Sequence, residues 1–119
     1  DFGIMSLKRG ETASCSSTTR GITAGGAPVS SKIIDFITMA SEGNAIVFGD
    51  LTGRTTSLAA GVSNGTRAVI AGGYTSTSSN AIDFVLFSTT GNAQDFGDLT
   101  VDRWSLGGAS DSHGGLGGF

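Results

Sequence analysis

The stretch that decides the fold is Ala81–Thr100, AIDFVLFSTTGNAQDFGDLT. Its first eight residues, Ala81–Ser88, are apolar at most positions and lack a clean in-and-out alternation, which predicts a strand that is covered on both faces. The turn residues Thr89–Asn92 follow, and Gln94–Leu99 predicts a further strand. The stretch therefore predicts two consecutive strands of a β-sheet.

The same stretch occurs a second time, earlier in the chain. Ile34-Asp35-Phe36 recurs as Ile82-Asp83-Phe84, an offset of 48 residues, and the motifs Gly-Asn-Ala and Phe-Gly-Asp-Leu-Thr recur at the same offset. Gly pairs recur at offsets of 47 and 45, at residues 25–26, 72–73 and 117–118. Several motifs in one order at one spacing indicate an internal repeat. We assign the units to residues 1–47, 48–95 and, in part, 96–119.

Each unit is predicted to contain four short antiparallel strands. In the second unit these are Leu58–Ser63, Arg67–Tyr74, Ala81–Ser88 and Gln94–Leu99, and an Asn64-Gly65 turn joins the first two. Gly and β-branched residues interrupt every longer window, which disfavours helix. The predicted fold class is all-β.

The order of features within a unit resembles the kelch repeat. A Gly pair is followed by an aromatic residue (Tyr74 or Phe119), then by a strand with an acidic residue, a turn, and an Arg (Arg54 or Arg103). The kelch Trp of the fourth strand is absent, and Phe48 and Phe96 are candidates for its role. More specifically, the blocks that begin at Ile34 and Ile82 are similar to the kelch-like repeats of large proteins in marine and cyanobacterial phages, some of them tail-fibre or virion-associated.

This resemblance implies about two and a half four-stranded blades of a β-propeller. It also implies a non-enzymatic structural or receptor-recognition role in the virion, without a cofactor. Two and a half blades cannot close a ring. The expected partners are therefore the remaining blades of a longer chain or copies of the chain itself, together with a host-surface glycan or other virion proteins.

Two alternatives come from other functional classes. One is a bacterial kelch-like module that binds protein or carbohydrate outside a virion, for example in an extracellular location. The other is a kelch-type propeller enzyme whose active site lies outside this stretch. Neighbouring domains, or a unique cluster of catalytic side chains, would distinguish these alternatives.

Composition argues against several classes of partner. The net charge is −3, and the seven basic residues are spread along the 119-residue chain, so no basic patch for nucleic acid is expected. No apolar run approaches the roughly 20 residues that would cross a membrane as a helix. With one Cys and one His, Cys15 and His113, neither an internal disulfide nor a Cys/His metal site is expected.

Asp35 and Asp83 are the most conspicuous candidate site residues, because each interrupts an apolar strand. They could form a repeated ligand or cation site, but a buried charge usually needs an ionic partner. The structural interpretation is therefore an ion pair between neighbouring blades with a repeated Arg, such as Arg20 and Arg67 or Arg54 and Arg103. The Gly pairs are predicted to allow close approach of two backbones rather than to bind phosphate.

The remaining candidates have structural interpretations that compete with functional ones. Asp95, Asp98 and Asp102, with Asp50 matching Asp98, could bind calcium or form a glycosidase pair, but solvated turn residues are favoured. His113 stands where other units carry Arg and is not expected to be catalytic. Two further positions are predicted to be structural: Cys15 as a small buried apolar residue and the sequon Asn64-Gly65-Thr66 as a hairpin turn. Tyr74 and Trp104 are candidates for stacking on a sugar and equally for packing.

Overall fold

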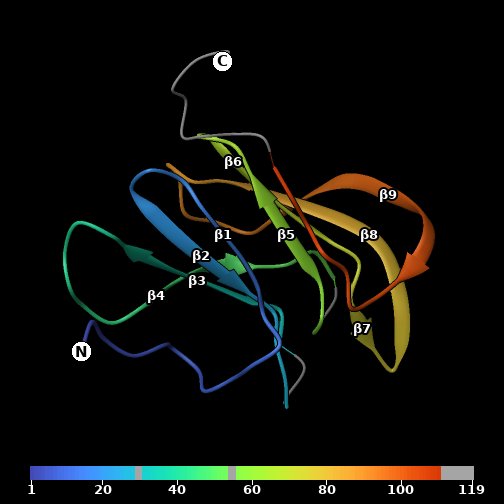
Figure 1. Cartoon of the computed structure of the whole chain (residues 1–119), viewed down its shortest axis with the longest axis horizontal. Coiled ribbons are helices and arrows are strands. Elements are labelled where there is room, and N and C mark those ends of the chain that lie inside the picture. Colours follow the sequence, from blue (N-terminus) through green and yellow to red (C-terminus); the bar gives the residue numbers. More distant parts are fainter. Residues whose placement is uncertain (29–30, 54–55, 111–119) are drawn as a thin grey trace.

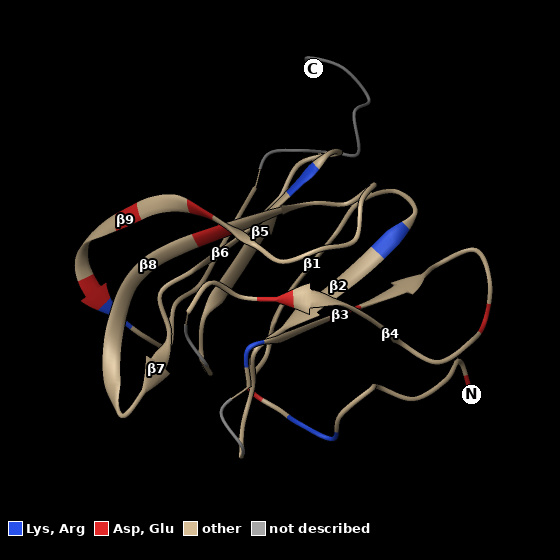
Figure 2. Ribbon diagram, turned by 180° about the vertical axis from the view of Figure 1, so that it is seen from behind, with Lys and Arg blue, Asp and Glu red and all other residues tan. Residues whose placement is uncertain are grey.

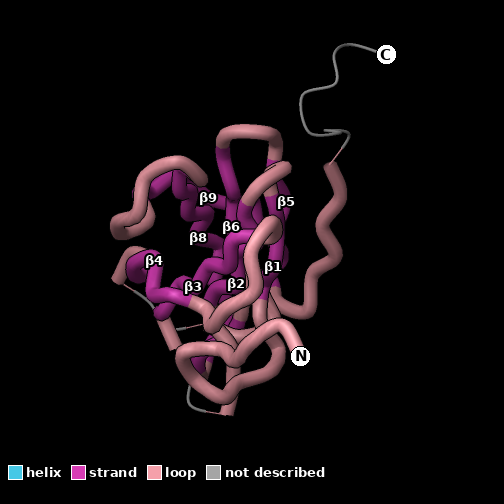
Figure 3. The backbone as a smooth tube through the Cα atoms, turned by 90° about the vertical axis from the view of Figure 1, so that its left-hand side faces the viewer, coloured by secondary structure: helices cyan, strands magenta, loops and turns pink. Residues whose placement is uncertain are grey.

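The computed structural model describes residues 1–28, 31–53 and 56–110 of the chain. These residues form two antiparallel β-sheets and no helix (Figures 1 and 3). The described part accordingly has no helix that could cross a membrane. The predicted all-β class and the antiparallel strands are confirmed, and the described residues do not close into a ring.

The first sheet follows the order of the chain. Its strands are β1 (Ala13–Ser16), β2 (Arg20–Ala24), β3 (Ile33–Thr38) and β4 (Ile46–Asp50), in the spatial order β1-β2-β3-β4. The register between β3 and β4 shifts at Ile34/Asp35, which marks a β-bulge or irregularity. This order places β1 at one edge and β4 at the other.

The second sheet repeats this order and adds a short strand. It contains β5 (Ala60–Ser63), β6 (Arg67–Ala71), β8 (Thr77–Leu86) and β9 (Gln94–Arg103), with β9 paired to β8. The two-residue strand β7 (Tyr74–Thr75) pairs with the beginning of β8. One of the two register shifts between β8 and β9, at Ile82/Asp83, lies at the position that Ile34/Asp35 holds in the first sheet.

Five predicted strand boundaries in the second sheet are wrong. Two are wrong by two residues, since the first strand begins at Ala60 and the third ends at Leu86. The other three differ by more, and each has a structural reason. The second strand ends at Ala71 rather than Tyr74, because the Gly pair turns the chain and Tyr74 begins β7. The third begins at Thr77, because Ser76 adopts a left-handed conformation (φ 68°) that folds the polar segment after it back onto β7. The fourth extends to Arg103, because the early part of β8 offers a partner, with Ser79 opposite Arg103.

The core lies within and between the two sheets. Ile22 and Ile34 of the first sheet and Ile70 of the second are almost completely buried. Phe48 of β4 is 4% exposed and contacts Phe36 edge to face, with ring centroids 5.8 Å apart. A set of small and apolar side chains completes the cluster: Ala13, Ala24, Leu51, Ala59, Ala68, Val85, Phe87 and Ala93.

The backbone contacts between the residues that precede β1, the residues that precede β5 and the residues that follow β9 recur with the sequence repeat. Glu11, Leu58 and Ser105 are spaced by 47 residues and share left-handed φ angles of 55°, 56° and 57°. Leu58 N donates to Glu11 O at 2.9 Å, and Ser105 N donates to Leu58 O at 2.9 Å. Residues 105–110 therefore begin to run along β5 in the same way as the residues before β5 begin to run along β1. Figure 1 shows β1 and β5 side by side.

The Gly pairs allow two backbones to approach closely, as predicted. A Cβ atom at Gly25 would lie 2.3 Å from Thr56 O, and one at Gly72 would lie 2.7 Å from Arg103 O. Gly26 N donates to Thr56 O at 2.7 Å in the same contact. The third pair, at 117–118, lies outside the described residues, as do Arg54, His113 and Phe119.

Candidate functional site

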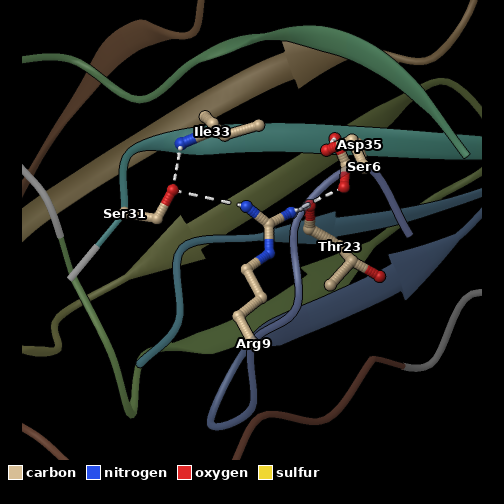
Figure 4. Close-up of polar contacts among 6 residues, drawn as sticks. All are labelled: Ser6, Arg9, Thr23, Ser31, Ile33 and Asp35. Carbon is tan, nitrogen blue, oxygen red and sulfur yellow. Dashed lines mark hydrogen bonds and ion pairs between the residues drawn. The ribbon is translucent and has the colours of Figure 1, made fainter. Parts of the chain in front are cut away.

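A buried polar cluster surrounds Arg9 and Asp35 (Figure 4). Arg9 Nη2 lies 3.0 Å from Asp35 Oδ2, and the two side chains are 1% and 2% exposed. Ser6 Oγ donates to Asp35 Oδ1 at 2.6 Å, while the guanidinium also donates to Ser31 Oγ at 3.3 Å and to Thr23 O at 3.4 Å. Burial lowers the pKa of Arg9, and the attraction of Asp35 opposes this effect. The cluster ties the N-terminal segment to the first sheet.

The predicted ion pair between Asp35 and an Arg is confirmed, but the partner is Arg9 rather than one of the arginines named in the prediction. Neighbouring residues of a strand point to opposite faces, so the face that bears Asp35 is not the face that bears Phe36. Arg20 lies on the Phe36 face, with its guanidinium carbon 4.5 Å from the ring centroid. There Arg20 Nη1 donates to Phe87 O of the second sheet at 2.6 Å, so this residue links the two sheets.

Asp83 repeats the position of Asp35 in the second sheet. It is buried, and Thr52 donates to its two carboxylate oxygens through Oγ1 and through the backbone N, the latter at 3.3 Å. Thr52 thus does for Asp83 what Ser6 does for Asp35. Arg67, one predicted partner, instead stacks on Phe84 at 4.7 Å, and Arg54 lies outside the described residues. Both carboxylates therefore face the preceding segment of the chain.

The repeated motifs Gly-Asn-Ala and Phe-Gly-Asp bind each other across the junction between the sheets. Gly91 N donates to Phe48 O and Ala93 N to Asp50 O, both at 2.8 Å, and Asp50 N donates to Asn92 Oδ1 at 3.1 Å. The Cβ of any other residue in place of Gly49 would lie 2.1 Å from Gly91 O. Only Gly therefore fits at this contact.

The N-terminal segment makes the same contact with the first sheet. Gly43 N donates to Phe2 O at 2.9 Å, Ala45 N to Ile4 O at 2.8 Å, and Ile4 N to Asn44 Oδ1 at 3.1 Å. This pairing of motifs was missed at the sequence level. The available signal was that both motifs recur at one spacing and that each contains a Gly.

The three clustered acidic residues all lie on one strand. Asp95, Asp98 and Asp102 are exposed on β9, and not in a turn as predicted. Asp50, which matches Asp98, forms an ion pair with Lys32 at 3.3 Å. No group of three His, Cys, Asp or Glu residues that could hold a metal ion occurs in the described ranges. The positions of Lys, Arg, Asp and Glu are spread over several strands and loops, as the colours of the ribbon in Figure 2 show.

Cys15 lies on β1 and is half-buried rather than fully buried, beside a groove of about 420 Å³. The groove separates the N-terminal segment from the first sheet and is lined largely by apolar side chains, among them Met5, Phe36 and Ile37. Burial raises the pKa of the Cys15 thiol to about 11, so the thiol is protonated at neutral pH. This protonated state makes Cys15 a weak nucleophile.

Tyr74 and Trp104 form an exposed aromatic pair. Their ring centroids are 5.6 Å apart, and the side chains are 40% and 51% exposed. At the positions 47 residues earlier the chain has Ala27 and Ser57, so the first unit has no such pair. The structure brings the two candidates for sugar stacking together on the surface.

The predicted turn at Asn64 is confirmed. Asn64 Oδ1 accepts hydrogen bonds from Thr66 N at 2.9 Å and from Arg67 N at 2.7 Å, which closes the β5–β6 hairpin. His113 lies outside the described residues. A scan against protein-family models finds no family that matches the chain, and no curated protein matches it.

Proposed function

We propose that the chain is a non-enzymatic structural and recognition module of a phage virion, in which each sheet is one blade of a kelch-like propeller. The observation that supports this best is the repeated junction. One set of main-chain and Asn hydrogen bonds joins residues 2–4 to the first sheet and β4 to the second. A unit that presents both halves of its own junction is suited to build a larger array.

The internal use of the repeated polar groups supports a structural role. Asp35 and Asp83 are buried and accept hydrogen bonds from the preceding segment of the chain. Buried charges that are paired in this way contribute to register and specificity more than to net stability. We therefore assign to both carboxylates the task of positioning one sheet on the next.

The aromatic pair supports the recognition part of the proposal. Tyr74 and Trp104 expose large apolar rings with polar edges, and such side chains are enriched where proteins bind partners. We propose that this pair stacks on a sugar of a host-surface glycan. The positions 47 residues earlier hold Ala27 and Ser57, and this difference distinguishes the aromatic pair from the repeated groups of the junction.

Two measurements test this proposal. Phage particles purified from the organism that carries the gene should yield peptides of this chain by mass spectrometry. The purified chain should also bind envelope polysaccharide of the host, and Tyr74→Ala and Trp104→Ala should each lower the affinity about tenfold or more, in line with the loss of a binding hot spot. Ile46→Ala, at an exposed apolar position on the other sheet, should leave binding unchanged.

The outcomes separate the alternatives. If the chain is absent from particles but binds polysaccharide through Tyr74 and Trp104, it is an interaction module outside the virion. If it is present in particles and binds no glycan, the recognition role is wrong and the structural role stands. If it is absent from particles and binds no glycan, both parts of the proposal are refuted.

A further inference from the structure

The outer face of β8 and β9 exposes groups that are covered at the equivalent place in the first sheet. Phe96 corresponds to Phe48 in the repeat, and each ring contacts the Phe of the neighbouring strand edge to face. Phe48 is 4% exposed because the second sheet covers it, whereas Phe96 is 52% exposed. The contact that buries the first ring is missing for the second within the described part of the chain.

The polar groups of the same face also lack the partners that their counterparts have. The Arg20 guanidinium donates to the main-chain carbonyl of Phe87, whereas the Arg67 guanidinium, in the equivalent stack on Phe84, makes no hydrogen bond to the described residues. The backbone of β4 at Phe48 and Asp50 binds a Gly-Asn turn. No described turn binds the corresponding edge of β9, Phe96–Asp98.

The chain itself begins to cover this side of the molecule. Ser63 Oγ donates to Ser16 O at 2.8 Å, and Ser110 Oγ, 47 residues after Ser63, donates to Ser63 O at 2.6 Å. A Cβ atom at Gly61 would meet Ser14 O at 2.8 Å, and one at Gly108 would meet Gly61 O at 3.0 Å. Residues 105–110 thus lie along β5 in the same way as β5 lies along β1. This is the place where the first strand of a third sheet would lie.

We propose that the β8–β9 face binds a third four-stranded sheet of this repeat, formed by chain that continues from residues 105–110. This proposal rests on the structural function proposed above, in which sheets of the repeat pack on one another, and it names the surface on which the next sheet packs. A Gly-Asn turn of the third sheet donates to the carbonyls of Phe96 and Asp98, and its Asn accepts from Asp98 N. A main-chain carbonyl of that sheet accepts from Arg67.

The proposal also assigns a partner to Thr100 and Arg103. Arg103 lies 94 residues, or two offsets of 47, after Arg9, and Thr100 lies 48 residues after Thr52. Both side chains are exposed. By analogy with the Arg9–Asp35 pair and the Thr52–Asp83 hydrogen bond, they receive the buried aspartate of the third sheet. This pairing requires an acidic residue at the bulge of its third strand.

A second copy of the folded chain fits this face less well. To repeat the junction, the incoming copy would place its Gly43–Asn44 turn on β9, but its own residues 2–4 already bind that turn. Its β1 would also have to replace residues 105–110 along β5. Chain that continues from residues 105–110 displaces nothing.

An extended chain tests this surface. Residues Thr75–Ser110 are appended after Phe119, because Gly117-Gly118-Phe119 corresponds in sequence to Gly72-Gly73-Tyr74. Val101→Ile in the appended copy makes its peptides distinct in mass from those of the original β9. Hydrogen exchange is then measured on residues 96–100 of the original strand, in the extended and the unextended chain.

We expect exchange at Asp98 of the original strand to slow by about tenfold or more, since a new hydrogen bond would hold its amide. Asn92→Ala in the appended copy is the matched control, and it should restore fast exchange at Asp98 alone. The proposal is overturned if exchange over residues 96–100 is unchanged, whether or not the appended strands fold. It is also overturned, in favour of a second copy, if the unextended chain dimerises and protects the same amides.

This experiment is independent of glycan and virion. A failure to bind polysaccharide, or absence from particles, would leave the expected protection of β9 unaffected. Unchanged exchange together with glycan binding would instead refute the surface and keep the recognition role.

Discussion

The clearest quantitative prediction compares Phe48→Ala with Phe96→Ala, the same change at equivalent positions of the two sheets. Phe48 is 4% exposed and packs against Phe36 as well as the second sheet, so its truncation removes core contacts and leaves a cavity. Such a change costs about 3–5 kcal/mol. Phe96 is 52% exposed, so water already hydrates about half of the ring and collapses around a truncated side chain. We expect a cost of about 1–2 kcal/mol there.

Urea unfolding followed by far-ultraviolet circular dichroism measures both costs. For a chain of this size the free energy falls by about 1–2 kcal/mol per molar urea, so Phe48→Ala should lower the midpoint by about 2–3 M and Phe96→Ala by about 1 M. Equal losses at the two positions would show that Phe96 is covered in solution. A loss at Phe48 as small as that at Phe96 would show that packing between the sheets does not stabilise the fold.

Three further predictions use matched positions in the same way. Arg20→Ala should lower the free energy of unfolding by about 1.5–3 kcal/mol, because it removes a charged hydrogen bond to Phe87 O. Arg67→Ala should lower it by less than about 1 kcal/mol. Equal losses for the two variants in urea unfolding would contradict this assignment. Gly49→Ala should strongly lower the melting temperature, because its Cβ would meet a backbone oxygen at 2.1 Å, while Gly107→Ala, with open space around it, should leave it nearly unchanged; a stable Gly49→Ala variant would refute the tight junction. Burial raises the pKa of Cys15 from 9.0 to about 11 in the folded state, so the unfolded state loses the thiol proton first and the free energy of unfolding should fall as the pH rises from 9 to 11. Cys15→Ala should remove this part of the fall when urea unfolding is measured across the same pH range. An identical fall in the variant would exclude the thiol as its cause.

Local patterns predicted the strands because they report on the nearest neighbours along the chain. The strand within the apolar run Ala81–Ser88 was predicted, although it ends at Leu86, and the turn at Asn64 was predicted correctly. Both were recognisable because burial on both faces and turn chemistry depend on consecutive residues. The sequence did not predict that the polar segment Thr77–Asn80 belongs to β8. Its strand partners are β7 and the end of β9, and no pattern of neighbouring residues indicates that pairing.

The polar sites show the same division. The sequence indicated that Asp35 and Asp83 need partners, but the nearest repeated arginines proved wrong for Asp35, because the alternation of strand faces puts Arg20 on the opposite side. The exposure of Asp95 on a strand, and the meeting of Tyr74 with Trp104, likewise depend on how distant segments pair.

By itself, the sequence determined an all-β chain with a repeat of about 47 residues, because strand periodicity, turn residues and recurring motifs are properties of the chain read in order. Only the tertiary structure decided that the Gly-Asn-Ala motif between β8 and β9 binds the Phe-Gly-Asp motif at the end of β4. It alone also decided that Phe48 is buried while Phe96 is exposed, although the two have nearly the same local sequence. The physical reason is that burial and pairing depend on which sheet lies opposite, and neighbours along the chain do not specify that.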